Sequence, residues 1–309
     1  MFVYPLLKRW GWHGLVYVNP DFVDPGEEPR PNLLDFWDGK CSREDLPTRG
    51  FLNWAELEIL DRSGILEIAS HSMTHTWYPT GPEIEDFHRP GLATPWLAWN
   101  ARPDRKPFYR LEPQEGFVPW GTPIHRNGRS LGIRRYFPDP DLATSVTEHV
   151  AGNGGREFFG NPDFRSCLSD VAREADRGRG RLETLEEMQS RFDFEIGRSL
   201  EILGKRLGRD IGHFCWPGGA YRDEAWEVLE GFDVRTVTVT RSDAGRWGAA
   251  DPRFIRRIPE YRSYSLRGRK LLTDDPHLLV AACDLELGLF TAGLELKARK
   301  LWEGLRAVA

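Results

Sequence analysis

Apolar runs alternate with amphipathic segments over most of this chain, a pattern that predicts strands and helices in alternation and therefore an α/β fold. One helix is expected from Asn53, because Glu56 stands in the capping-box position and Gly64 closes the segment. A long amphipathic helix is expected over residues 183–207, where apolar side chains recur every three or four positions up to Gly208. The other expected elements are helices at residues 2–10 and 223–229 and strands at residues 14–19, 65–69, 212–216, 234–240 and 254–258.

Residues 77–181 interrupt this alternation. The segment is dense in proline, glycine and arginine, is too long for a simple loop, and contains one short helix expected at residues 164–175. We interpret it as a long irregular insertion into a main domain of residues 1–275. Residues 276–309 are expected to form a C-terminal helical extension.

The composition excludes several classes of protein. A chain of 309 residues can bury one large core, and single α/β barrels often reach this length. The formal charge of −5, without long blocks of like charge, argues against nucleic-acid binding. Neither a membrane-spanning segment nor a signal peptide is predicted. Four scattered cysteines indicate free thiols in a reducing compartment, so a cytoplasmic location is expected, with an extracytoplasmic location as the open alternative.

Two histidines follow the strand at residues 65–69, in the segment Ser70-His71-Ser72-Met73-Thr74-His75. A strand that ends in two imidazoles four positions apart can aim both at one point, and neutral imidazole is a common zinc ligand. The carboxyl end of a strand is also where α/β proteins place their chemistry. The structural alternative is a hydrogen-bonded pair at a strand end, but the surrounding pattern favours a metal site.

This segment resembles the second motif of the polysaccharide deacetylase (NodB-homology) family of carbohydrate esterases, a strand ending in Ser/Thr-His-x-x-Ser/Thr-His. The run Phe214–Tyr221 resembles a third family motif, a strand ending in a Pro-Tyr-Gly-like turn. The likeness extends to residues 2–19 and 234–259, in the family's order. It implies a distorted (β/α) barrel of the NodB type, with the insertion covering the barrel mouth.

The family's first motif, a strand ending in Phe-Asp-Asp-Gly, has no counterpart here, because the chain starts inside the helix that normally follows it. That motif supplies the catalytic base and the third metal ligand. Either the given sequence lacks a beginning that the working protein has, or the protein has lost this base and ligand. The first alternative is favoured, because the missing piece would also be a barrel strand whose absence leaves strand edges unpaired.

The resemblance implies a metal-dependent hydrolase that removes N-acetyl groups from a saccharide or polysaccharide precursor, in surface-polysaccharide biosynthesis or modification. The implied ligands of a divalent metal, expected to be zinc, are His71 and His75. The implied oxyanion donor is the backbone N–H of Gly218. His277 is the candidate acid, with His88 and His125 as equal alternatives, whereas His213 is expected to be structural. Cys215, where many family members carry an arginine, is assigned no catalytic role.

A replacement carboxylate is sought at Asp21 and Asp24, which follow the strand ending at Asn19 and are expected at the same edge of the sheet as His71. Asp21 is the candidate third metal ligand. An aspartate in a turn before proline also satisfies local backbone donors without any functional role, so this alternative stays open.

Substrate contacts are expected from aromatic and basic residues near these motifs. Glycine at position 218 removes an aromatic wall that Trp216 or Tyr221, beside Pro217, can replace. In the insertion, an arginine beside aromatic rings can clamp a carboxylate or phosphate while a ring stacks on sugar, which suits an acidic glycan or a nucleotide- or lipid-linked saccharide. The insertion residues proposed for this are Trp120 and Arg89, and the structural alternative is a solvated lid anchored by its aromatics.

Two other functions remain open. A non-catalytic glycan-binding or scaffold protein on the same fold would follow directly from loss of the first motif. A metal-dependent hydrolase of another carbon–nitrogen bond, as in related cyclic-amide hydrolases, would keep the two histidines. A saccharide is the expected partner of both the N-deacetylase and the glycan-binding protein. The sequence does not predict the sugar, its linkage or the oligomeric state.

Overall fold

The structure is a computed structural model that describes residues 3–239 and 251–256, the backbone of residues 263–266 and 269–272, and single positions between residues 280 and 302. It divides into two compact units, Met1–Thr238 and Val239–Ala309. Each unit is described by itself. The side chains of the candidate site that the structure describes belong to the first unit.

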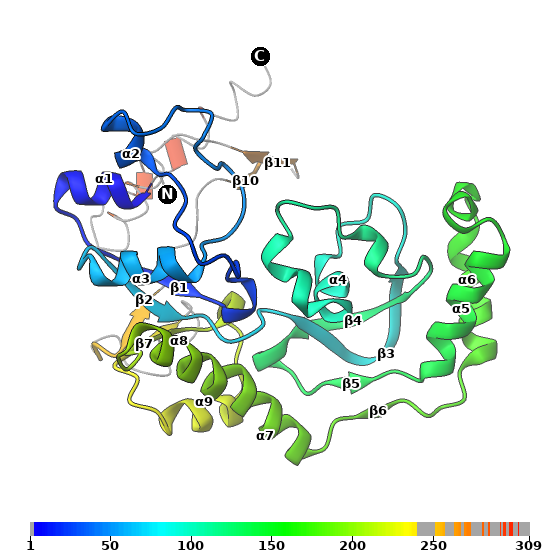
Figure 1. The fold of residues 1–309 in the computed structure, drawn as a ribbon. Coiled ribbons are helices and arrows are strands. Elements are labelled where there is room, and N and C mark those ends of the chain that lie inside the picture. Colours follow the sequence, from blue (N-terminus) through cyan, green and yellow to red (C-terminus); the bar gives the residue numbers. More distant parts are fainter. Residues whose placement is uncertain are drawn as a thin grey trace. The chain divides into compact units, whose positions relative to one another are not determined.

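In the described part of the first unit, four parallel strands form a central sheet in the order β1, β2, β7, β8 (Figure 1). The strands are β1 (Gly14–Val18), β2 (Leu66–Ser70), β7 (His213–Cys215) and β8 (Thr236–Val239). The register places Ser70 opposite both Val18 and Phe214. Parallel strands end at one edge of their sheet, so the segments that follow β2 and β7 emerge side by side. The predicted α/β class is confirmed, and closure into a barrel stays a prediction.

Helices predicted from capping signals are present in this unit. Asn53 and Glu56 form the expected capping box before α3, and α8 ends at Gly208, whose φ of 68° is left-handed. The predicted helix over residues 183–207 is divided by a π-helical turn. The helices around the sheet are α1 (Val3–Trp10), α3 (Trp54–Arg62), α7 (Leu185–Asp193), the π turn η6 (Phe194–Arg198), α8 (Ser199–Leu207) and α9 (Asp223–Glu230).

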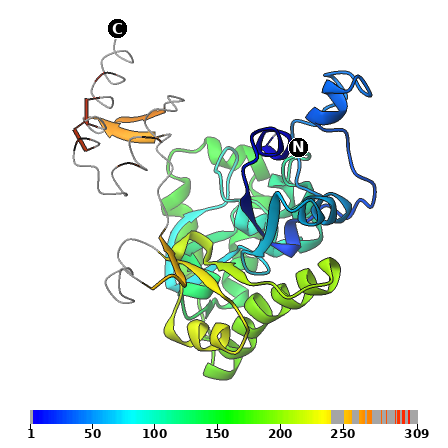
Figure 2. The same ribbon diagram turned by 90° about the vertical axis from the view of Figure 1, so that its left-hand side faces the viewer.

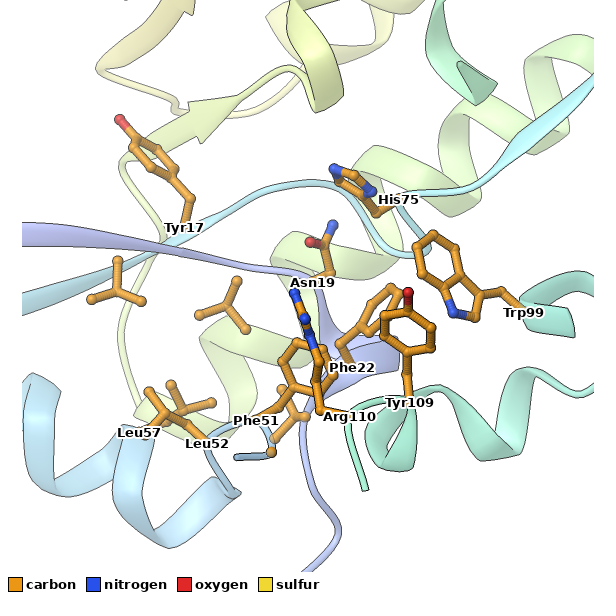
Figure 3. A pocket seen from close by; sticks show the side chains of 14 residues that line it. Tyr17, Asn19, Phe22, Phe51, Leu52, Leu57, His75, Trp99, Tyr109 and Arg110 are labelled. Carbon is orange, nitrogen blue, oxygen red and sulfur yellow. The ribbon is translucent and has the colours of Figure 1, made fainter. Parts of the chain in front are cut away.

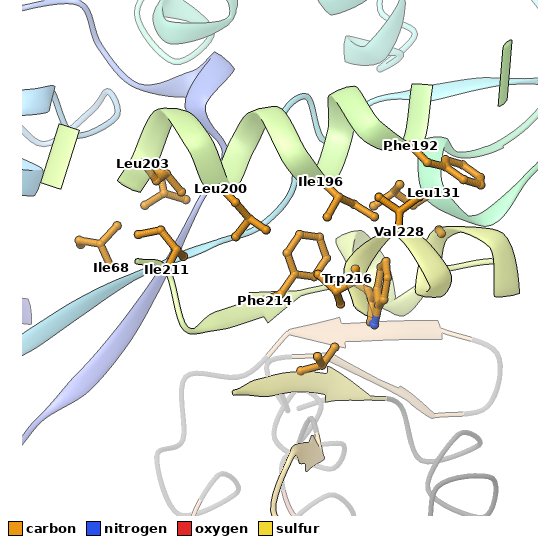
Figure 4. Packing of buried hydrophobic residues seen from close by; sticks show 14 of the residues in the cluster. Ile68, Leu131, Phe192, Ile196, Leu200, Leu203, Ile211, Phe214, Trp216 and Val228 are labelled. Carbon is orange, nitrogen blue, oxygen red and sulfur yellow. The ribbon is translucent and has the colours of Figure 1, made fainter. Parts of the chain in front are cut away.

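The core of this region joins the sheet to the long helix (Figure 4). Phe214 and Ile196 are fully buried, and Figure 4 shows the Phe214 ring facing the helix that carries Ile196 and Leu200. Because apolar burial is the main driving force of folding, this contact holds β7 against the long helix.

The insertion is more regular than the sequence predicts. The helix expected at residues 164–175 is confirmed as α6 (Phe164–Ala175), and it lies beside α5 (Pro140–Gly152) in Figure 1. The prediction of an otherwise irregular segment is wrong, because β3 (Trp77–Phe87) and β4 (Pro123–Arg129) form a long antiparallel pair. Prolines, glycines and shifts of register within this pair obscure the two-residue alternation that marks a strand.

The insertion has its own apolar core, formed by residues of β3, α5 and α6 such as Phe87, Val146 and Leu168. Its remaining elements are α4 (Pro95–Ala101), the short strands β5 (Tyr136–Phe137) and β6 (Arg181–Leu182), and the 3-10 turns η2 (Pro103–Phe108), η3 (Glu115–Phe117), η4 (Ser130–Gly132) and η5 (Gly155–Gly160). Short elements elsewhere in the first unit are η1 (Pro20–Phe22), α2 (Leu33–Trp37) and η7 (Pro217–Gly219).

The second unit contains β9 (Phe254–Arg256) and the antiparallel pair β10 (Ser263–Leu266) and β11 (Arg269–Leu272), drawn in orange in Figure 2. The strand expected at residues 254–258 is therefore present as β9. Single positions between residues 280 and 302 are helical. Over the parts of the chain described, no helix combines the length and the apolar character needed to cross a membrane.

Candidate active site

His71 continues the parallel ladder beyond the last residue of β2. Its backbone N–H donates to the Val18 carbonyl at 2.9 Å, and its ring Nδ1 lies 2.6 Å from the Cys215 carbonyl at the end of β7. Because a carbonyl oxygen only accepts, Nδ1 carries a proton, and in the neutral ring the lone pair is then on Nε2. The neighbouring strand thus fixes both the orientation and the tautomer of His71.

A strained turn brings His75 back to His71. Ser72 and His75 have φ values of 65° and 51°, the only left-handed values among the non-glycine residues that the structure describes. Such backbone conformations cost free energy for residues with a Cβ atom and persist where surrounding contacts hold them. The result is that the two imidazole ring centroids lie 5.1 Å apart.

The contacts that hold this turn come from Glu195, which sequence reasoning missed. Glu195 lies in the π turn η6 and is 1% exposed. Its carboxylate accepts hydrogen bonds from the Thr74 backbone N–H, at 3.0 Å, and from the Thr74 hydroxyl, while its own carbonyl accepts from Met73 N–H at 2.8 Å. The available signal was a carboxylate on the apolar face of an amphipathic helix, which requires a buried partner.

His75 is neutral at pH 7. Burial, followed by the proximity of His71 and Arg129, lowers the pKa of His75 to about 4. Arg129 Nη1 lies 3.3 Å from His75 Nδ1, and the Arg129 guanidinium is 4.4 Å from the centroid of the Trp77 ring. A neutral imidazole can act as a metal ligand or a hydrogen-bonding partner without first losing a proton.

The turn after β7 lies beside the same pair. Gly218 has a φ of 62°, and a Cβ atom at this position would lie 2.7 Å from Arg129 Nε. The left-handed backbone conformation therefore favours glycine here, and a larger residue would also displace the Arg129 side chain. Arg129 thus contacts His75 and packs against Gly218, so the structure brings together the two sequence motifs and a residue of β4 that was not predicted.

The predicted aspartates are held by other partners. Asp21 Oδ2 lies 2.7 Å from Nζ of Lys106, which is 2% exposed and also donates to the Thr74 carbonyl at 3.3 Å. Asp24 lies 3.5 Å from Arg30. Within the described ranges, no group of three histidine, cysteine, aspartate or glutamate side chains could hold a metal ion. The two histidines have donor chemistry that fits zinc, and the structure does not bring Asp21 to them as a third ligand.

The predicted substrate residues are distributed differently from the expectation. Trp216 is fully buried and packs on Phe214, so its assignment as a wall of the substrate site is wrong. Pro217 is buried as well, and Tyr221 stacks on Trp216 with ring centroids 4.9 Å apart. An indole inside the core has no face to offer to a sugar.

The predicted residues of the insertion lie among its own elements. Trp120 stacks on His88, with ring centroids 4.8 Å apart, and Arg89 pairs with Asp86 at 3.3 Å. His125 Nδ1 lies 3.1 Å from the Pro82 carbonyl. The candidate acid His277 lies outside the described residues.

A cavity of about 450 Å³ lies beside His75 (Figure 3). Its lining joins the end of β1, the start of α3 and residues of the insertion, among them Trp99, Tyr109 and Arg110. Asn19 also lines it, and its side-chain amide donates to the carbonyls of His71 and Ser72. The cavity is therefore built on the same turn that holds the two histidines.

Comparison with known proteins gives a fold-level result. No family model and no curated protein matches the chain. Among solved structures, the chain matches the BpsB deacetylase domain from Bordetella bronchiseptica, at 16% identity and a TM-score of 0.42, over 82% of this chain and 64% of that one. The chain is structurally similar to de-N-acetylase domains.

A second solved structure, a de-N-acetylase from Aggregatibacter actinomycetemcomitans, matches at 13% identity and a TM-score of 0.41, over 82% of this chain and 63% of that one. The chain therefore spans a little under two thirds of the length of either structure. The similarity concerns the fold, and the chemistry of this chain has to be argued from its own side chains.

Proposed function

We propose that this protein is a metal-dependent hydrolase that removes N-acetyl groups from a saccharide or polysaccharide precursor. The observation that carries the proposal is the convergence of His71 and His75, with ring centroids 5.1 Å apart, after strand β2 and beside a cavity with aromatic walls. Strained backbone at both Ser72 and His75 supports a functional rather than a purely structural pair.

The two histidines are the proposed ligands of a divalent ion, with zinc as the expected metal. A histidine that binds a metal usually donates its other ring N–H to a carbonyl or carboxylate, as His71 Nδ1 does to the Cys215 carbonyl, and His75 is neutral. When bound, such an ion lowers the pKa of water to about 7 and polarises an amide carbonyl. Asp21 stays the proposed third ligand, and its use requires the Lys106 ion pair to open.

The remaining roles are proposed for residues around this pair. Hydrolysis joins a water oxygen to the amide carbon, breaks the C–N bond and needs a proton on the departing amine. The backbone N–H of Gly218, in the turn after β7, is the proposed donor to the tetrahedral oxyanion. Tyr221 is kept as a proposed substrate contact, and His277 as the proposed acid.

The proposed setting is the cytoplasm, within biosynthesis or modification of a surface polysaccharide. Support for the compartment comes from Cys41, Cys167 and Cys215, which are free thiols in the structure.

One observation favours a second candidate, a glycan-binding or scaffold protein without catalysis. The described residues place two cations at the turn, Arg129 against His75 and Lys106 against Asp21, and they supply no third metal ligand. Positive charge at these positions disfavours a dication by ordinary Coulomb repulsion.

Metal analysis combined with an assay for acetate released from N-acetylated oligosaccharides tests the proposal. The wild type is expected to retain zinc and release acetate, and His71→Ala and His75→Ala are expected to lose both. His149→Ala, on the remote helix α5, is the matched control and keeps both. Equal metal content in all four proteins would remove the proposed site.

A further inference from the structure

The cavity beside His75 has one wall made of aromatic rings. Phe22 meets Trp99 edge to face at 5.0 Å between ring centroids, and Trp99 meets Tyr109 in the same way at 5.3 Å. Figure 3 shows these rings around the cavity, with Leu52, Leu57 and Phe51 on the side away from His75. Rings held by edge-to-face contacts form a rigid apolar surface, which suits stacking of the apolar face of a sugar.

Arg110 adds a positive charge to this lining. Its guanidinium lies 5.6 Å from the centroid of the Tyr109 ring, and Figure 3 shows the side chain extending toward Asn19. In the part of the chain that the structure describes, Arg110 makes no ion pair. Its basic neighbours are engaged: Arg102 pairs with Asp104 at 2.8 Å, Arg105 pairs with Glu112, and Lys106 pairs with Asp21 at 2.7 Å.

We infer that this cavity binds a saccharide that carries an anionic group, a carboxylate or a phosphate, with Arg110 pairing to the anion and the aromatic wall packing on the sugar ring. The inference rests on the proposed function only in taking a saccharide as the ligand. A guanidinium binds carboxylate and phosphate oxygens through two parallel hydrogen bonds, which gives orientation as well as affinity. The volume of about 450 Å³ lies within the usual range of small-molecule sites.

The position of the cavity connects this anchor to the histidine pair. His75, Asn19 and Arg110 all line it (Figure 3). An anion held by Arg110 therefore directs the attached sugar toward His75. Arg110 thus acts as a specificity-determining residue that selects acidic over neutral saccharides.

Binding of defined oligosaccharides to the full chain tests the inference, measured by calorimetry with a chelator present so that no turnover occurs. The probes are a tetrasaccharide of alternating glucuronate and N-acetylglucosamine, N-acetylglucosamine 6-phosphate, and neutral N-acetylglucosamine oligomers as the reference. At least one anionic probe is expected to bind about tenfold more tightly than the neutral probe of equal length. The arm that shows the preference identifies the carboxylate or the phosphate as the recognised group.

Arg110→Gln is expected to reduce the affinity for the preferred anionic probe to that for the neutral one, and Arg110→Lys to restore part of it. Arg156→Gln, at an exposed arginine of the turn η5, is the matched control and keeps the preference. Circular-dichroism melting of each variant verifies that folding is unchanged. Equal affinity for anionic and neutral probes in the wild type, or equal effects of Arg110→Gln and Arg156→Gln, would overturn the inference, as would the absence of binding to any probe.

The two proposals fail separately. An Arg110-dependent preference for anionic probes, without metal or acetate release, would leave this inference standing and remove the hydrolase. Acetate release from neutral oligomers without any anionic preference would do the reverse.

Discussion

The sheet region and the insertion are each stabilised by a different kind of contact. The sheet region is a scaffold in which apolar side chains of β2, β7 and the long helix bury one another. The insertion has a smaller apolar core and many arginine contacts with carboxylates and aromatic rings, such as Arg135 over Tyr78 at 4.1 Å. The scaffold supplies the two histidines, and the insertion supplies Arg129, Lys106 and Arg110 around them.

This difference shows how one site can be assembled from two kinds of sequence. His71 and His75 both follow β2, and they meet through a short local turn whose left-handed residues are Ser72 and His75. The cations of the insertion reach the site through contacts between residues far apart in the sequence. Arg191 of α7, whose side chain is 9% exposed, strengthens this junction by donating to the carbonyls of Ser130 and Ile133 in the insertion.

The largest expected effect comes from breaking the scaffold core. Phe214→Ala should lower the free energy of unfolding by about 3–5 kcal/mol, because it leaves a cavity beneath the long helix. Leu168→Ala in the insertion core is the comparison, with an expected loss of about 2–4 kcal/mol. Urea unfolding followed by circular dichroism measures both. If unfolding shows a separate transition that shifts in Leu168→Ala but not in Phe214→Ala, the insertion unfolds independently of the sheet region.

Lys106→Met removes the ammonium group and is expected to lower the free energy of unfolding by about 3 kcal/mol, because Asp21 then loses its partner in a buried ion pair. Lys40→Met is the matched control. Its pair with Asp38 is exposed, with 65% and 57% of the two side chains accessible, and should contribute about 0–1 kcal/mol. Chemical denaturation of both variants gives the comparison. Similar small losses would mean that the insertion is not anchored to the histidine turn through Lys106.

The smallest expected effect is a loss of stability at low pH. A side-chain hydrogen bond from Arg179, with support from backbone N–H groups, lowers the pKa of Asp139 in the insertion to about 2 from an ordinary value of 3.8. Because the folded-state pKa is the lower one, this contribution to stability is complete above about pH 4 and is lost as the pH falls toward 2. Melting temperatures of wild type and Asp139→Asn should therefore converge over this interval. Curves that remain parallel would exclude the Arg179 contact as a source of stability.

Much of the scaffold could be predicted from sequence because its signals are local. The capping box of Asn53 and Glu56 and the left-handed Gly208 lie within a few residues of the helix ends that they define. His71 and His75 were identified for the same reason, as a spacing that follows a strand. Two features of this pair could not be predicted from the sequence. They are the strained turn between the histidines and the hydrogen bond from His71 to the Cys215 carbonyl.

The parts that sequence reasoning missed depend on distant partners. Lys106 has no local sequence signal for its role and is buried against Asp21, which lies 85 positions away. The role of Glu195 depends on its hydrogen bonds with Thr74, which lies 121 positions away. Trp216 was assigned to the substrate wall because aromatics suit sugars, but the same apolar surface also suits the core, where the structure places it.

X-ray absorption at the zinc edge, on protein loaded with one equivalent of zinc, tests the central claim most directly. The account predicts imidazole scattering with zinc–nitrogen distances of about 2.0–2.1 Å, a signal that is lost in both His71→Ala and His75→Ala. A spectrum without imidazole ligands, or one that is unchanged in these variants, would contradict the assignment of the histidine pair as a metal centre.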